Sequence, residues 1–143
     1  MKLMSLLSLL LSLSLIASLP NQASTTEISD QQATEQVIRA QLEAFQQGDI
    51  NKAYQFASPA VREHFPDVHQ FGEMVRTGYK PVYMPKSIRF MKYLAGQKPP
   101  VQHVVIIGPT GQAWDAYYSM TKDATDQWKI AGVHLRKRNE SAI

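Results

Sequence analysis

The sequence has no cysteine at any of its 143 positions. This absence excludes disulfide bonds and a lipid anchor attached through cysteine. A hydrophobic core must therefore hold the fold, and a chain of this length is long enough to build one in a single domain. The net charge of +3 is too small to indicate a nucleic-acid partner.

Signatures of catalysis and nucleotide binding are missing as well. The chain has no Ser/His/Asp elbow, glycine-rich phosphate loop, HExxH or CxxC motif, and residues 108–111 have the composition of a hairpin turn. Of the four histidines, His64 and His69 are five positions apart with Pro66 between them, a spacing that zinc sites do not favour. We therefore expect no metal site and no cofactor.

The N-terminal segment has the composition of a signal peptide. Lys2 is followed by a charge-free, leucine-rich run over residues 3–19 and then by short residues up to Ala23. The run is shorter than the roughly 20 apolar residues of a membrane-spanning helix, and no basic flank follows it. We predict cleavage, no stable membrane span afterwards, and an exported protein that is periplasmic or secreted.

The first half of the exported chain is predicted to be helical. Ser29 and Gln32 have the spacing of a capping box, and apolar residues then recur at helical intervals. Gly48 can end this helix in the left-handed conformation. Further on, Ser58 followed by Pro59 is typical of a new helix start. Together these signals predict a block of helices.

The second half is predicted to form β-strands, because β-branched and aromatic runs alternate with turn residues. The runs cover residues 86–94, 101–107, 112–120 and 127–135. Their separators are long enough for antiparallel hairpins and too short for crossover helices. The expected fold is α+β, with N-terminal helices packed on a curved four-stranded antiparallel sheet, cone-like and with room for a pocket. The predicted parts are a signal peptide (1–23), a flexible lead-in (24–30), a single α+β cone-like domain (31–138) and a tail (139–143).

Two sets of residues carry a family resemblance. The Gln47-Gly48-Asp49 junction between two helices and the closing strand over residues 128–133 resemble the nuclear-transport-factor-2-like superfamily, which also houses ketosteroid isomerase and SnoaL-type cyclases. The run from Phe56 to Pro85 is similar to an uncharacterised bacterial family, domain of unknown function 4864. The resemblance implies a cone-like fold and a cell-envelope setting, and it supplies no catalytic residues.

Asp115 is the most informative carboxylate, since aspartate is disfavoured inside a β-strand. Alternation places it with Tyr117 on one face of its strand, and Trp114 and Tyr118 on the other. If the face of Asp115 lines the pocket, burial raises its pKa toward that of a general base, with Tyr117 or His103 as proton donor. If that face lies outside, these residues are solvated surface.

The interval between Glu73 and Asp115 contains no acidic residue. Basic and aromatic residues are interleaved there, which is typical of a surface that binds an anionic ligand, an acidic partner or phospholipid headgroups. The plainer interpretation is a solvated loop and an edge strand whose lysines deter aggregation. The candidate ligand-binding residues are Arg76, Tyr79, Lys80, Tyr83, Lys86 and Arg89.

We expect a non-enzymatic binding module for a small molecule or an envelope protein. The alternative is a cofactor-free isomerase or dehydratase of the ketosteroid-isomerase type, with Asp115 as general base and Tyr117 or His103 as proton donor. The direction of the Asp115 side chain separates the two: burial beside a tyrosine or histidine favours the enzyme, and exposure removes its best base.

Overall fold

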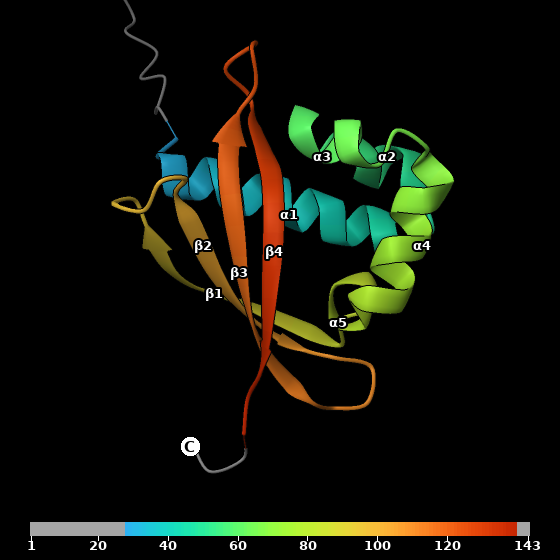
Figure 1. The fold of residues 1–143 in the computed structure, drawn as a ribbon. Helices are drawn as coiled ribbons and strands as arrows, with labels where there is room; N and C mark the ends of the chain where they lie inside the picture. The colour runs from blue at the N-terminus through green and yellow to red at the C-terminus, as the bar shows by residue number, and fades with distance from the viewer. Residues whose placement is uncertain (1–27, 140–143) are drawn as a thin grey trace, which may run out of the picture.

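The computed structural model describes residues 28–139, and the predicted signal peptide lies outside them (Figure 1). A block of helices is followed by a block of strands, which confirms the predicted order. The helices are α1 (Asp30–Gln46), α2 (Ile50–Gln55), α3 (Pro59–His64), α4 (Val68–Gly78) and α5 (Lys80–Tyr83). The strands are β1 (Ser87–Leu94), β2 (Val101–Ile107), β3 (Ala113–Lys122) and β4 (Trp128–Lys137). Over the residues that the structure describes, none of these helices is long and apolar enough to cross a membrane.

The helices begin and end where local chemistry predicts. The Ser29 hydroxyl accepts from the Gln32 amide at 3.2 Å, and the Gln32 side chain accepts from the Ser29 amide, which completes the capping box at the start of α1. Gly48 has a φ of +71°, the left-handed conformation expected after this helix. Asp49 then caps α2, and Ser58 caps α3. Side-chain caps thus satisfy amides that the helix itself leaves unpaired.

The four strands form one antiparallel sheet in the order β1-β2-β3-β4. The predicted range of β2 is confirmed, and the other three strands begin one residue later than expected. β3 and β4 also continue two residues further, because their ends pair with each other out to Trp114↔Lys137 and Lys122↔Trp128. This helical block on an open antiparallel sheet confirms the predicted α+β fold.

All the described helices lie on one side of the sheet, and α1 crosses it diagonally (Figure 1). The core lies between these two layers. Its buried side chains from α1 include Ile38 and Leu42, each of which stabilises the fold by about 1.5–3 kcal/mol through burial. The sheet contributes Val104, Ile106, Ala116, Tyr118 and Met120. Even-numbered residues of β2 and β3 therefore face the helices, and odd-numbered residues face away.

Edge strand β4 is also tied to the helical block. The Ser58 amide donates to the Ile130 carbonyl at 2.9 Å, and the Ile130 amide donates to the Phe56 carbonyl at 2.8 Å. Ala57 and Ile130 form the resulting parallel bridge. This link holds the turn before α3 against the first part of β4.

Candidate functional site

A cavity of about 250 Å³ lies between the helices and edge strand β4. Its buried walls come from α1, α4, α5 and β4, with Phe45, Phe71, Val75, Val82 and Ile130 among them. These residues are there because the apolar stripes of the helices all turn toward the sheet. The cavity is therefore a gap within the core itself.

One buried wall residue is polar. Gln41 on α1 is 4% exposed, and its side-chain amide donates to the Ala53 carbonyl of α2 at 3.1 Å. This hydrogen bond holds the Gln41 amide in place beside the cavity and satisfies a donor that would otherwise be costly to bury. It also connects α1, which lines the cavity, to α2.

The rim of the cavity is half-buried or exposed. α3 supplies Val61 and His64, the residue after α4 is Tyr79, and β4 contributes Val133. The Tyr54 hydroxyl positions α3, since it lies 2.6 Å from the Phe65 carbonyl at the end of that helix. Polar groups are thus confined to the rim and to Gln41, and most of the lining is apolar.

This composition suits binding better than chemistry. Within residues 28–139 the lining includes no carboxylate, and its groups able to transfer a proton are His64 and Tyr79 at the rim. An apolar cavity of about 150 Å³ is large enough to bind benzene. The cavity here is larger, at about 250 Å³, and its rim offers a tyrosine and a histidine to orient a ligand.

The structure does not bring the six predicted ligand-binding residues to one place. Tyr79 lines the cavity, whereas Arg76 and Tyr83 line a second hollow of about 150 Å³. The Arg76 guanidinium is paired with Glu73, with 2.7 Å between Nη2 and Oε2. Hydrogen bonding to Glu73 is the main cause of the raised pKa of Arg76. The remaining three, Lys80, Lys86 and Arg89, are exposed.

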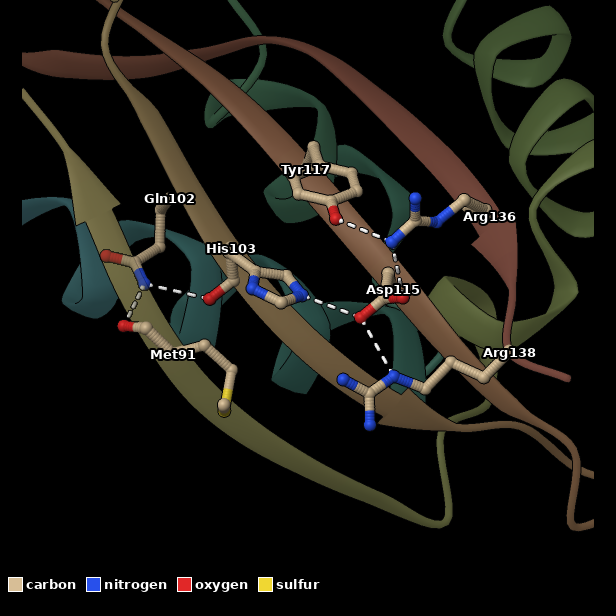
Figure 2. A network of polar contacts seen from close by, with 7 residues as sticks. All are labelled: Met91, Gln102, His103, Asp115, Tyr117, Arg136 and Arg138. Carbon is tan, nitrogen blue, oxygen red and sulfur yellow. Dashed lines mark hydrogen bonds and ion pairs between the residues drawn. The ribbon is translucent and has the colours of Figure 1, made fainter. Parts of the chain in front are cut away.

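Asp115, Tyr117 and His103 do lie together, on the face of the sheet that points away from the helices (Figure 2). Asp115 is only 4% exposed although no described helix covers it. Its Oδ1 accepts from His103 Nε2 at 2.7 Å and from Arg138 Nε at 2.9 Å, and its Oδ2 accepts from Arg136 Nη2 at 3.2 Å. Three donors from two neighbouring segments therefore surround one carboxylate.

These donors decide the ionisation of Asp115. Burial raises its pKa, but the hydrogen bonds from His103, Arg136 and Arg138 outweigh burial, and the pKa is lowered below its ordinary value. A raised pKa was expected only if this face lined the pocket, and the face points away from the helices instead. The expectation of a solvated Asp115 on such a face is corrected, because these donors bury the carboxylate. An ionised carboxylate only accepts hydrogen bonds, so His103 must donate through Nε2.

Tyr117 completes this group, which we name the outer network: His103, Asp115, Tyr117, Arg136 and Arg138. The Tyr117 ring lies parallel to the His103 ring with centroids 4.7 Å apart, and its hydroxyl accepts from Arg136 Nη2 at 3.1 Å. None of the five residues lines the cavity. They come from β2, β3, β4 and the residue after β4, and Figure 2 shows them on one face of the sheet.

Two parts of these sites were missed by sequence reasoning. Arg136 and Arg138 were not among the predicted site residues, although their alternate positions and the pairing of Asp115 with Arg136 place both beside Asp115. The cavity wall left no local signal, because its residues have the same apolar pattern as those that fill the core. A correct pairing of β3 with β4 would have identified the two arginines. The cavity can be recognised only from the packing of the whole structure.

Comparison with family models identifies a family for this chain. The family model described as "Domain of unknown function (DUF4864)" matches residues 27–143, which include every helix and strand described above. No curated protein and no solved structure matches the chain.

Proposed function

The chain belongs to the family "Domain of unknown function (DUF4864)", and we propose that it is a non-enzymatic binding module that takes a small, mainly apolar molecule into the cavity between its helices and β4. The cavity carries this proposal. Its volume is about 250 Å³ and most of its lining is apolar, so a ligand that replaces water there gains hydrophobic stabilisation along its whole length.

The polar residues support a ligand with one polar end. Gln41 lies in the wall, and Tyr79 and His64 lie at the rim. A few polar groups in an apolar pocket fix the orientation of a ligand, while the apolar walls supply most of the affinity. The expected ligand therefore has a ring or a short chain as its body and a single hydroxyl, carbonyl or acidic group at the mouth of the cavity.

Asp115 meets the criterion set for the isomerase alternative, since it is buried and accepts a hydrogen bond from His103 at 2.7 Å. The position of these residues relative to the cavity nevertheless gives that alternative less support. Asp115, Tyr117 and His103 lie on the opposite face of the sheet from the helices, and none of them lines the cavity. The lowered pKa of Asp115 makes its carboxylate a weaker base than an unpaired one. A substrate in the cavity would thus be out of reach of the proposed base.

Export and membership of the nuclear-transport-factor-2-like superfamily are part of the same proposal. Export is supported by the leucine-rich leader, and the superfamily by the order of helices and strands. Intact-mass measurement of protein from the cell-envelope fraction should show a chain that begins between Leu19 and Thr25. Recovery of full-length chain alone would contradict export.

Cavity binding is tested with anilinonaphthalene sulfonate, an apolar dye with one acidic group. We expect its fluorescence to rise on binding to the wild-type protein. Val61→Trp places a large side chain at the rim from α3 and should weaken dye binding at least about tenfold, since a filled pocket removes the apolar contacts that provide most of the affinity.

The matched control is Val68→Trp, a half-buried position on α4 that does not line the cavity. This variant should bind the dye within about twofold of the wild type. Val133→Trp fills the cavity from β4 and provides a second test if Val61→Trp does not fold. Equal binding by the wild type and both filling variants would show that the dye binds elsewhere and would refute the proposal.

A further inference from the structure

Charge is distributed unevenly between the two layers of the protein. Asp115 is the one acidic residue in the four described strands, whereas those strands contain six basic residues. The basic residues are Arg89, Lys92, Lys122, Lys129, Arg136 and Lys137. The helices by contrast contain acidic and basic residues in similar numbers. The sheet is therefore the basic part of the molecule.

The strand register places three of these charges in one row across the outer face. Arg89 is paired with Val105, Val105 with Asp115, and Asp115 with Arg136. Arg138 lies two residues further along the chain than Arg136 and also reaches Asp115. The row thus has an arginine near each edge of the sheet and a single buried carboxylate between them.

Most donors of the two network arginines are unused within the described chain. Each guanidinium has five N–H groups. Arg136 contributes only Nη2 to the network and Arg138 only Nε. The side chains of Arg136 and Arg138 are 65% and 37% exposed, against 5% for Asp115. Both arginines can therefore donate hydrogen bonds to a further carboxylate on the solvent side.

Asp115 also holds these arginines in place. A long side chain loses about 0.5–1.5 kcal/mol of conformational freedom when a partner immobilises it. Here a buried carboxylate immobilises both arginines before a partner binds. The partner therefore contacts two guanidinium forks, planar groups of N–H donors, that are already oriented. One carboxylate does not neutralise two guanidinium groups, and Arg89 adds another positive charge in the same row.

From this arrangement we infer that the outer face of the sheet docks an acidic peptide segment of a partner protein, whose carboxylates pair with Arg136, Arg138 and Arg89. Adjacent strands are about 4.8 Å apart, so the row from β1 to β4 spans about 14 Å. A single small anion cannot bridge that span, but a peptide with several carboxylates can.

Nucleic acid fits this face less well than an acidic peptide. Binding of single strands depends on aromatic rings whose faces are free to stack on bases. His103 and Tyr117 instead stack on each other, with 14° between their planes. Arginine forks, which pair with carboxylates in a bidentate manner, are the groups that this face presents.

The test measures binding of a hexaglutamate peptide to the purified protein by calorimetry at about 0.1 M salt. The variant Asp115→Asn/Arg136→Gln/Arg138→Gln removes both forks and also the carboxylate that would otherwise be left buried without partners. The dissociation constant should increase at least about tenfold, because charge-assisted hydrogen bonds are lost. Thermal unfolding verifies that the variant is folded.

Lys52→Gln on α2 is the matched control, since it changes the net charge by the same single unit at an exposed site on the helical layer. It should change the dissociation constant less than about twofold. If it weakens binding as much as the triple variant, the attraction is general rather than local and the inference fails.

Arg136→Lys/Arg138→Lys keeps both charges beside Asp115 and remains informative if the triple variant does not fold. It should weaken peptide binding roughly threefold or more, because lysine has no fork. Unchanged binding in the two arginine variants overturns the inference. So does inorganic phosphate or a single-stranded oligonucleotide that binds this face as tightly as the peptide does.

Discussion

The two faces of the sheet bury their residues in different ways. On the inner face, Tyr118 and Met120 are 0% exposed because the apolar sides of the helices cover them. On the outer face, Asp115 reaches 4% exposure without a helix, because the side chains that bind it also cover it. Burial of a strand residue therefore does not show that it faces the core, and a buried carboxylate does not show an active site.

Two adjacent tyrosines on β3, Tyr117 and Tyr118, show the same difference between the two faces. Tyr118 points inward, and its hydroxyl has no hydrogen-bond partner among the described residues. Burial raises the pKa of this tyrosine. Tyr117 points outward and accepts a hydrogen bond from Arg136. One face thus tolerates a polar group inside an apolar core, while the other is built from polar contacts.

The largest expected effect comes from Asp115→Asn, which removes the negative charge and one of the two acceptor oxygens that the arginines share. We expect the free energy of unfolding at pH 7 to fall by about 1–3 kcal/mol, the usual cost of losing buried hydrogen bonds to a charged group. Urea titration measures it. Glu63→Gln, the same change at an exposed position on α3, should cost less than about 0.5 kcal/mol. A comparable loss in both variants would mean that the outer network contributes nothing specific.

The pH dependence of that difference tests the cause. Because the pKa of folded Asp115 lies below its ordinary value of 3.8, the stabilisation is fully present above that value and is lost as the pH falls through the folded-state pKa. The difference in free energy of unfolding between the wild type and Asp115→Asn should thus be constant from pH 7 to about pH 5 and should decrease at lower pH. A gap that widens as the solution becomes more acidic would show that the pKa is raised instead.

Smaller effects on stability are expected at the two tyrosines, and the two substitutions should have opposite signs. Tyr118→Phe removes a hydroxyl that is buried without a partner, so the free energy of unfolding should rise by up to about 1 kcal/mol. Tyr117→Phe removes the hydrogen bond from Arg136, and stability should fall by about 0.5–1 kcal/mol. Chemical denaturation of both variants side by side measures the difference. Loss of stability in Tyr118→Phe would show that the hydroxyl has a partner, such as a buried water.

Most of the fold could be predicted because its signals are local. The capping box at Ser29, the left-handed Gly48 and the Ser58-Pro59 helix start depend on residues within three or four positions of one another. Strand alternation likewise placed Asp115 and Tyr117 on one face and Tyr118 on the other. Trp114 shows the limit of that pattern, since it lies on the inner face but is only half-buried near the end of its strand.

The sites were predicted less completely. Sequence reasoning identified Asp115, Tyr117 and His103 as candidates, and they do lie together. It expected a raised pKa for Asp115 if its face lined the pocket and a solvated side chain if that face lay outside. Neither occurs, because two arginines from β4 and the residue after it bind the carboxylate on the outer face and lower its pKa. The six basic and aromatic candidates are close in sequence, but they are distributed over α4, α5, the outer face and the segments between them.

The order of helices and strands, their caps and the alternate residues that share a face of each strand follow from the sequence alone, because each depends on neighbouring residues and on the periodicity of apolar side chains. Only the tertiary structure decided which partners surround Asp115, where the basic residues gather and where the cavity opens. Those features depend on strand register and on how well side chains from distant elements fill the space between two layers, and neither is encoded in any short stretch of the chain.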